Sequence, residues 1–248
     1  MRYLVLSDIH GNLEALEAVL RAAAAQQYER VLVLGDLVGY GPDPNAVVER
    51  VRGLEPAGVI RGNHDKAAAG VEDTADFNAV ARVAAQWTAQ VLTPENREYL
   101  AGLPAGPQLV NGLVEICHGS PVDEDRYIFS EREASRALQA SRRRACFFGH
   151  THVALAARLL EPMRVQVEMP EGRPEFEIAV RAEGKTLINP GSVGQPRDSD
   201  ARAAYALADI EGGWVRLCRV AYPIQAVQGK ILAAGLPSVL AHRLAIGR

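Results

Sequence analysis

RYLVLSDIHGN, residues 2–12, is the stretch that decides the fold. Residues 2–7 form a short apolar run with β-branched and aromatic members, which is typical of a buried strand. The run ends at Asp8, and Asn12 then precedes apolar residues at helical spacing, which predicts a helix over about residues 13–25. A buried strand that leads through a polar loop into a helix is the repeating unit of layered α/β folds.

The same pattern returns twice within the next sixty residues. A second strand over 30–34 ends at Gly35-Asp36, and a helix follows over 43–52. A third, short strand over 59–61 ends at Gly62-Asn63-His64-Asp65. Three strand–loop–helix units predict parallel strands. Because open α/β sheets bind ligands beyond the carboxyl ends of their strands, the polar residues at these ends become candidate site residues.

The rest of the chain predicts a second sheet. Strands are expected over 113–117, which leads into His118, and over 145–148, which leads into Gly149-His150. Helices are expected over 75–100, 131–140 and about 224–245. No low-complexity linker or repeat divides the sequence, so we expect a single domain over residues 1–248. Antiparallel sheet is predicted between residues 154 and 220, where strand-like runs alternate with short turns at 156–160, 164–168, 176–180, 186–188, 203–209 and 215–220.

Composition excludes several classes of protein. The 248 residues are 48% hydrophobic and carry a net charge of −3, as in ordinary globular proteins, and do not predict attraction to nucleic acid or anionic membranes. The N-terminus does not read as a signal peptide, and no apolar stretch approaches the roughly 18 residues of a membrane span. The three cysteines form no Cys-x-x-Cys pair, which indicates a reducing compartment. We therefore expect a cytoplasmic protein without a membrane partner.

Histidines gather at the predicted strand ends. A lone histidine is more often a packing or surface residue, and His242 in the apolar tail is interpreted that way. Packing does not readily explain five that follow strands, namely His10, His64, His118, His150 and His152.

Carboxylates and an amide accompany these imidazoles. Asp8, Asp36 and Asn63 supply oxygen, and no motif contains a thiolate, so the donor mixture suits Mn, Fe, Zn, Ni or Co. Alternate residues of an extended segment share a face, so Asp8-x-His10 and His150-x-His152 should each project as a pair. These groups suffice for two metal ions with positions left for water.

In these motifs the chain resembles the calcineurin-like metallophosphoesterase superfamily. Five blocks stand in the family's order: Asp8-Ile9-His10, Gly35-Asp36, Gly62-Asn63-His64-Asp65, His118 and Gly149-His150-Thr151-His152. Residues 35–42, GDLVGYGP, and 189–197, NPGSVGQPR, are similar to the bacterial and archaeal phosphodiesterase branch. The protein serine/threonine phosphatase branch has Asp-Arg-Gly where this chain reads Leu37-Val38-Gly39-Tyr40.

The resemblance implies a fold, a metal site and a reaction. The fold is a four-layer α/β/β/α sandwich of two mixed sheets flanked by helices. The metals are two divalent ions, foremost Mn²⁺, with Fe, Zn, Ni or Co as alternatives. The reaction is attack of a metal-bridging hydroxide on a small phosphodiester. The ligands would be Asp8, His10 and His152 for one ion, Asn63, His118 and His150 for the other, and Asp36 as the bridge.

His64 is left without a metal in this pattern. It would protonate the leaving oxygen or stabilise charge on the phosphoryl group, and Asp65 would orient it. Three further residues each have two interpretations. Asn12 contacts substrate or only caps a helix, Arg197 binds phosphate or is a solvated loop residue, and Tyr40 lines the pocket or packs beneath the loop.

Several functions stay open at this level. One alternative is a phosphomonoesterase or protein phosphatase on the same site; another is a non-catalytic metal-binding scaffold, against which the presence of His64 argues. A different metallohydrolase class would place His-x-His on the first strand, where this chain has Asp8-x-His10. Nucleic acid is expected as a partner only as short strands. The natural substrate, the native metal and the oligomeric state, including a homo-oligomer, are not specified.

Overall fold

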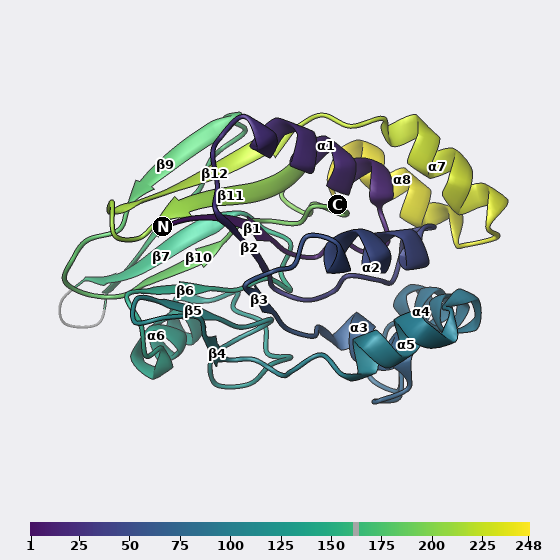
Figure 1. Cartoon of the computed structure of the whole chain (residues 1–248), viewed down its shortest axis with the longest axis horizontal. Helices are drawn as coiled ribbons and strands as arrows, with labels where there is room; N and C mark the ends of the chain where they lie inside the picture. Colours follow the sequence, from purple (N-terminus) through teal and green to yellow (C-terminus); the bar gives the residue numbers. More distant parts are fainter. Residues whose placement is uncertain (161–163) are drawn as a thin grey trace.

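The computed structural model describes residues 1–160 and 164–248, and Figure 1 shows two sheets stacked between helices. The first sheet has the order β3 (Gly58–Val59), β2 (Arg30–Val33), β1 (Arg2–Leu6), β11 (Ala203–Asp209), β12 (Trp214–Val220) and β9 (Glu175–Ala179). The second has the order β4 (Gln108–Leu109), β5 (Val114–Ile116), β6 (Ala145–Phe147), β10 (Thr186–Asn189), β7 (Leu155–Leu160) and β8 (Arg164–Glu168).

Helices cover both outer faces. α6 (Glu131–Ala140) lies against β7, β8 and β10 of the second sheet. α1 (Leu13–Ala24) lies against β11 and β12 of the first, next to α2 (Pro44–Arg52) and α7 (Ile224–Ala233), which packs on α8 (Ser238–Ile246). The remaining helices, α3 (Asn63–Ala69), α4 (Ala79–Val91) and α5 (Pro94–Ala101), group together at the right of Figure 1. The four-layer α/β/β/α sandwich is thereby confirmed.

β1 shows how the sequence builds these layers. Leu4 and Leu6 pack into the apolar cluster beneath α1, whereas Tyr3 and Val5 pack into the cluster between the two sheets. Side chains of a strand alternate between its faces, so a strand covered on both sides must be apolar throughout. The uninterrupted apolar run that opens the sequence is explained by this position.

Parallel pairing brings the strand ends of interest together. β1 pairs parallel with β2, and β2 pairs parallel with β3. In the second sheet β5, β6 and β10 are also parallel neighbours. The loops that follow these strands therefore leave each sheet at one edge.

The helix predicted over 75–100 is wrong in its extent. It is two helices, α4 and α5, which are separated where Leu92 adopts an extended conformation, with φ −61° and ψ 132°. Thr93 caps α5 by accepting a hydrogen bond from the Asn96 N–H, and Pro94 occupies the first turn, where it needs no partner. The predicted tail helix is likewise divided into α7 and α8, at Gly235 with φ +71° and Pro237.

The prediction of antiparallel sheet between residues 154 and 220 is right for most strands but wrong for one edge of β10. β10 pairs antiparallel with β7 and parallel with β6. β11, β12 and β9 are antiparallel and extend the first sheet. Within the two described ranges, none of the helices has both the length and the apolar character needed to cross a membrane.

Candidate metal centre

The expected ligands meet where strands of both sheets end. Asp8 and His10 follow β1, Asp36 follows β2, His118 follows β5, and His150 and His152 follow β6, while Asn63 is the first residue of α3. Their donor atoms form two groups that could each hold a metal ion, with Asp36 in both. The groups are Asp8, His10, Asp36 and His152, and Asp36, His118 and His150.

Left-handed backbone conformations produce this convergence. Five of the expected ligands have positive φ: Asp8 52°, His10 50°, Asp36 53°, His150 67° and His152 60°. The expected extended backbone is therefore wrong for both pairs. The donors of Asp8 and His10 nevertheless lie in the same group, whereas His150 and His152 belong to different groups. Each such residue costs about 1–3 kcal/mol of backbone strain, which persists only where the surroundings enforce it and is common at functional sites.

Hydrogen bonds between loops hold the strained backbone in place. The N–H groups of Asp8 and His10 donate to the carbonyls of Gly35 at 3.1 Å and Asp36 at 2.9 Å. The Ser192 hydroxyl donates to the Asp8 carbonyl at 2.7 Å. Asn189 Nδ2 donates at 3.0 Å to the carbonyl oxygen of Gly149, just before His150. The segment 189–197 thus ties the loops after β1 and β6 to each other.

Three histidines of the site have a fixed tautomer. The Nδ1 atoms of His10, His118 and His152 lie 3.1, 2.8 and 2.6 Å from the carbonyl oxygens of Val38, Leu34 and Gln195. A carbonyl only accepts hydrogen bonds, so each Nδ1 carries the hydrogen. In the neutral ring the lone pair is then on Nε2, the arrangement found in metal-binding histidines.

These Nε2 atoms face other acceptors. His10 Nε2 lies 3.1 Å from His152 Nε2, and His118 Nε2 lies 3.3 Å from Asn63 Oδ1. His150 Nε2 is buried and finds no hydrogen-bond partner among the described residues. Two donors bound to one metal at about 2.1 Å are roughly 3–3.5 Å apart, so these spacings fit a shared cation. The residues present therefore fit metal ions.

The charges of the site are compatible with a bound cation. Burial raises the pKa of Asp8 to about 6. Burial would also raise the pKa of Asp36, but the imidazoles of His118 and His64 outweigh it and hold that pKa well below its usual value. Burial lowers the pKa of His118, yet the Asp36 carboxylate outweighs it and raises that pKa to about 10. A proton on His118 therefore balances the carboxylates, and a bound divalent ion would displace it.

His64 lies beside both groups without joining either. Its ring centroid is 4.9 Å from that of His10, 4.3 Å from Tyr40 and 4.8 Å from Phe77. A Cβ at Gly39 would come within 2.4 Å of His64 Nδ1, so only glycine fits there. Burial lowers the pKa of His64 to about 4, which leaves the ring neutral at physiological pH.

The carboxylate of Asp65, which is expected to orient His64, makes its hydrogen bonds to the backbone. Its two carboxylate oxygens accept hydrogen bonds from the N–H groups of Val38, at 3.1 Å, and Gly62, at 3.0 Å, and no hydrogen bond to the His64 ring occurs in the described structure. Asp65 therefore holds the backbone on both sides of the site. The segment at Val38 must be fixed because its carbonyl orients His10. The segment at Gly62 must be fixed because it lies against Asp36, where a Cβ on Gly62 would come within 2.1 Å of Asp36 Oδ1.

The three expected substrate contacts have different surroundings. Asn12 is 2% exposed; its Oδ1 accepts from the Ala15 N–H and its Nδ2 donates to the Gly194 carbonyl, so the structure assigns it to the helix cap and not to substrate. Tyr40 packs on His10 and His64 and also lines a cavity, so both interpretations hold in part. The Arg197 guanidinium lies 5.6 Å from the Tyr40 ring centroid, close to the site.

Two aromatic residues of the site walls, Tyr127 and Phe77, are not singled out by the sequence. The Tyr127 ring stacks on the His150 ring, with centroids 3.8 Å apart and planes at 22°. Tyr127 and Phe77 come from loops with no periodic pattern, so no signal marks them. Acidic residues that follow His118 are also fixed by ion pairs, because Lys66 binds Glu124 and Asp125.

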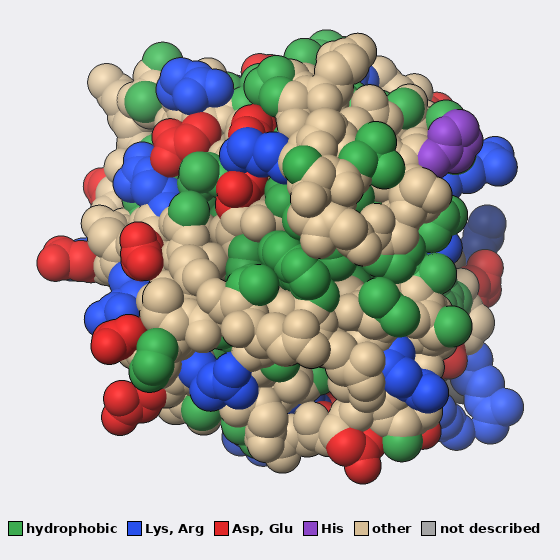
Figure 2. All heavy atoms as spheres, turned by 90° about the vertical axis from the view of Figure 1, so that its right-hand side faces the viewer, with side chains coloured by type: hydrophobic (Ala, Val, Ile, Leu, Met, Phe, Trp, Pro, Cys, Tyr) green, Lys and Arg blue, Asp and Glu red, His purple; other side chains and the backbone are tan. Residues whose placement is uncertain are grey.

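The five histidines of the site are at most 5% exposed. Figure 2 shows the face at the right of Figure 1, and histidine colour appears at its edge and not in its middle. Apolar side chains gather across the centre of this face. A cavity of about 210 Å³, lined by Asn63, His64 and His150 among others, adjoins the metal centre.

Comparison with known proteins gives consistent relatives. A family model for the calcineurin-like phosphoesterase superfamily domain matches residues 1–213. An uncharacterized protein from Methanocaldococcus jannaschii is 35% identical over 98% of this chain and 97% of its own. The crystal structure of a metallophosphoesterase from Sphaerobacter thermophilus superposes with a TM-score of 0.89 and 41% identity over 100% of both chains. A hypothetical protein from Pyrococcus horikoshii OT3 has the same fold, with a TM-score of 0.79 and 22% identity over 100% of this chain and 98% of its own.

Proposed function

Because the chain belongs to the calcineurin-like phosphoesterase superfamily, we propose that it is a phosphodiesterase that uses two divalent metal ions. The observation that carries the proposal is the position of Asp36. Its Oδ2 lies 3.5 Å from His10 Nε2 and 3.5 Å from His118 Nε2, one donor from each group. Its Oδ1 accepts the His64 N–H at 2.9 Å, which fixes the carboxylate in this orientation. An anionic two-oxygen group in that place suits the link between two cations.

The remaining donors divide around Asp36. We assign Asp8, His10 and His152 to one ion and Asn63, His118 and His150 to the other. The nitrogen and oxygen donors suit Mn²⁺, which we propose as the working metal, and also Fe, Zn, Ni or Co. Two such ions would lower the pKa of a water molecule and offset the charge of the phosphoryl oxygens.

His64 and Arg197 would act on the phosphate itself. Hydrolysis places the hydroxyl of water on phosphorus, breaks the ester P–O bond and leaves a proton for the departing oxygen. Since the pKa of His64 is lowered to about 4, its ring is neutral before substrate binds, which favours stabilisation of developing charge over donation from an imidazolium. Arg197 Nε is buried without a hydrogen-bond partner in the described part of the chain, so its N–H can donate a hydrogen bond to a phosphate oxygen.

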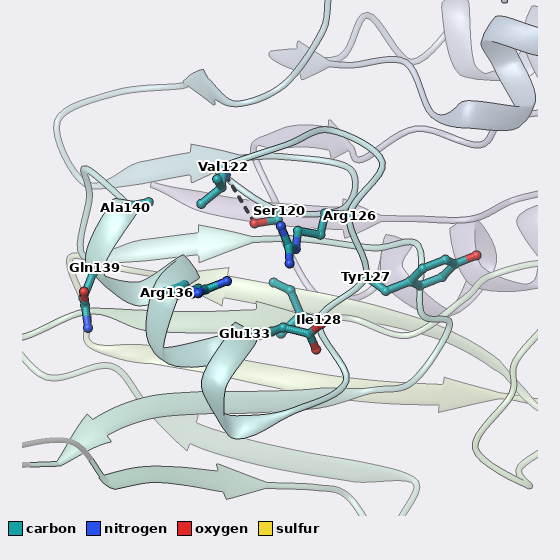
Figure 3. A pocket seen from close by; sticks show the side chains of 9 residues that line it. All are labelled: Ser120, Val122, Arg126, Tyr127, Ile128, Glu133, Arg136, Gln139 and Ala140. Atoms are coloured by element: carbon teal, nitrogen blue, oxygen red, sulfur yellow. Dashed lines mark hydrogen bonds between the residues drawn. The ribbon is translucent and has the colours of Figure 1, made fainter. Parts of the chain in front are cut away.

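The cavity beside the metal centre has room for one ester group of a substrate. It measures about 210 Å³ and is lined by His64, His150 and Tyr127 among others. A larger cavity of about 510 Å³ shares Tyr127 and is lined by Arg126 and Arg136, but by none of the proposed metal ligands. In Figure 3 the Tyr127 ring points out of this larger cavity, away from the two arginines. The proposal of a diester therefore rests on the similarity of residues 35–42 and 189–197 to the phosphodiesterase branch.

We propose a small phosphoester as the substrate. The buried histidines and the modest size of the adjoining cavity favour a small molecule or the end of a short strand over duplex nucleic acid or a folded phosphoprotein. Cytoplasmic location and self-association remain predictions from the sequence.

The assay that tests this function compares two activated esters. With Mn²⁺, the protein is expected to hydrolyse bis(4-nitrophenyl) phosphate faster than 4-nitrophenyl phosphate, and chelation should lower the rate by at least about a hundredfold, because both the water and the phosphate depend on the ions. Added Mn²⁺ should restore the rate. Faster hydrolysis of the monoester would favour a phosphomonoesterase, and no turnover with any of the metals named above would favour a scaffold.

A further inference from the structure

The cavity of about 210 Å³ beside His64 and His150 has a lining of unusual charge. Both histidines are more than nine-tenths buried, and they form its inner wall together with Asn63. The lining has no lysine or arginine and has four carboxylates, from Glu72, Asp73, Asp76 and Asp125.

Two of these carboxylates share one lysine, and the other two have no ion-pair partner among the described residues. Lys66 forms ion pairs with Glu72, at 2.7 Å, and with Asp125. Asp73 and Asp76 are exposed and make no ion pair with lysine or arginine in the described ranges. Arg82 is close in sequence, but its guanidinium donates to backbone carbonyls of residues 74, 75 and 77. The mouth of the cavity is therefore negative, and its loop is held in shape.

Aromatic rings form the other walls. Phe77 packs against the His64 ring with centroids 4.8 Å apart, and Tyr127 stacks on His150 at 3.8 Å. Tyr40 completes this set of rings. Flat, apolar walls favour a planar group, and both the ring faces and the carboxylates favour a group that is neutral or positive over one that is negative.

Part of the inner wall is already assigned to the metal ions. His150 Nε2, buried without a hydrogen-bond partner among the described residues, is a proposed metal donor, whereas the His64 ring, with its Nδ1 also unpartnered, lines the cavity and belongs to neither donor group. The larger cavity differs, because its lining carries Arg126 and Arg136 against a single acid, Glu133 (Figure 3). The Glu133 carboxylate is already engaged by the N–H groups of Phe129 and Ser130, so that lining is positive on balance.

We propose that the acidic, aromatic cavity binds the leaving ester group of the substrate and selects a planar group that is uncharged or cationic. The inference rests on the proposed phosphodiesterase function, which places the leaving oxygen beside His64. An ester group that carries its own carboxylate or phosphate is disfavoured in this cavity. The substrate class is accordingly a phosphodiester whose leaving ester group contains a planar moiety that is uncharged or cationic.

The test uses three methyl phosphodiesters of 4-nitrophenol, with a trimethylammoniomethyl group, no charged group or a carboxylate on the ring. The Mn²⁺-loaded wild type is compared with Asp73→Asn/Asp76→Asn, which keeps the side-chain shapes and the acceptor of the Ala75 N–H. For each ester the ratio of kcat/KM between variant and wild type cancels the reactivity of the leaving group. We expect that ratio to fall about three- to fivefold for the cationic ester, to stay within about twofold for the neutral ester and to rise for the carboxylated ester.

A matched control removes the same net charge elsewhere. Glu171→Gln/Glu183→Gln alters two exposed residues outside the cavity lining and should leave all three ratios near one. Equal ratios for the three esters in Asp73→Asn/Asp76→Asn, or the same pattern in the control, would overturn the proposal. Hydrolysis of none of the esters by any protein would instead overturn the phosphodiesterase function, and this inference with it.

Binding of the free phenols supplies a readout that needs no metal. Titration calorimetry on metal-free protein should show that the trimethylammoniomethyl phenol binds more tightly than the carboxylated phenol. The aspartate double variant should weaken the cationic phenol by about three- to fivefold. Equal affinity of wild type for the two phenols would contradict the assigned selectivity even if the esters are hydrolysed.

Discussion

Asp36→Asn protein is expected to lose both metal ions and at least about a thousandfold of kcat/KM, because the amide has a single oxygen and no charge. In the wild type one carboxylate oxygen faces His10 and His118, and the other accepts the His64 N–H. The single side-chain oxygen of an asparagine can either face the metal donors or accept the His64 N–H, but it cannot do both. Metal per chain after gel filtration, measured by mass spectrometry beside the kinetics, should fall from about two to below one.

The control for this change is Asp209→Asn. Asp209 lies opposite Arg2, at the amino end of β1 and thus at the other end of the strand from the metal centre. It accepts the Gly212 N–H, which asparagine can also do, so metal and activity should be retained. Because Asp36→Asn removes the buried partner of protonated His118, its metal-free thermal midpoint should fall below that of metal-free wild type, so metal content is compared at a temperature at which both proteins are folded. Full metal content in Asp36→Asn would show that Asp36 is not the shared ligand.

His64→Ala protein is expected to keep about two metal ions per chain while kcat falls by about a hundredfold to ten-thousandfold. The His64 ring belongs to neither group of donor atoms. Its backbone N–H, which binds Asp36 Oδ1, is kept in alanine. The loss should therefore fall on turnover, with metal affinity unchanged.

Two companion variants make the His64 result specific. His242→Ala changes the exposed histidine of α8 and should leave both turnover and metal content unchanged. His64→Gln retains a neutral hydrogen-bond donor and should recover part of the lost kcat if the ring acts as a neutral donor. Loss of metal in His64→Ala would mean that His64 is a ligand, and unchanged kcat would remove it from the reaction.

The fold follows from local patterns where the chain alternates strand, loop and helix. The apolar run of residues 2–7 predicts a doubly covered strand because that burial leaves no place for polar side chains. The break at Leu92 and the parallel pairing of β10 with β6 are less visible. The first depends on a cap at Thr93, and the second depends on which partner lies beside a strand of only four residues.

The candidate site was predictable in its members and not in its geometry. Strand ends and residue types select Asp8, Asp36 and His118, and the structure brings them together. The left-handed conformations of Asp8 and His10 cannot be predicted from the residue types, because neither residue is glycine. Hydrogen bonds from the neighbouring loop hold both residues at these φ values. The hydrogen bonds of Asp65 to the N–H groups of Val38 and Gly62 are likewise not predictable, because backbone partners leave no pattern of residue types in the sequence.

The walls of the site depend on long-range contacts. Tyr127 meets His150, and Phe77 meets His64, across loops that carry no helical or strand periodicity. The proposed substrate preference therefore comes from the structure alone, whereas the reaction class was already indicated by the order of the motifs.

Anomalous diffraction from crystals of the Mn²⁺-loaded protein would show whether two metal ions share Asp36. We expect two manganese peaks about 3.5–4 Å apart, one on each side of Asp36 Oδ2. One peak should be bound by Asp8, His10 and His152, and the other by Asn63, His118 and His150. A single peak, or two peaks that do not share Asp36, would contradict this arrangement.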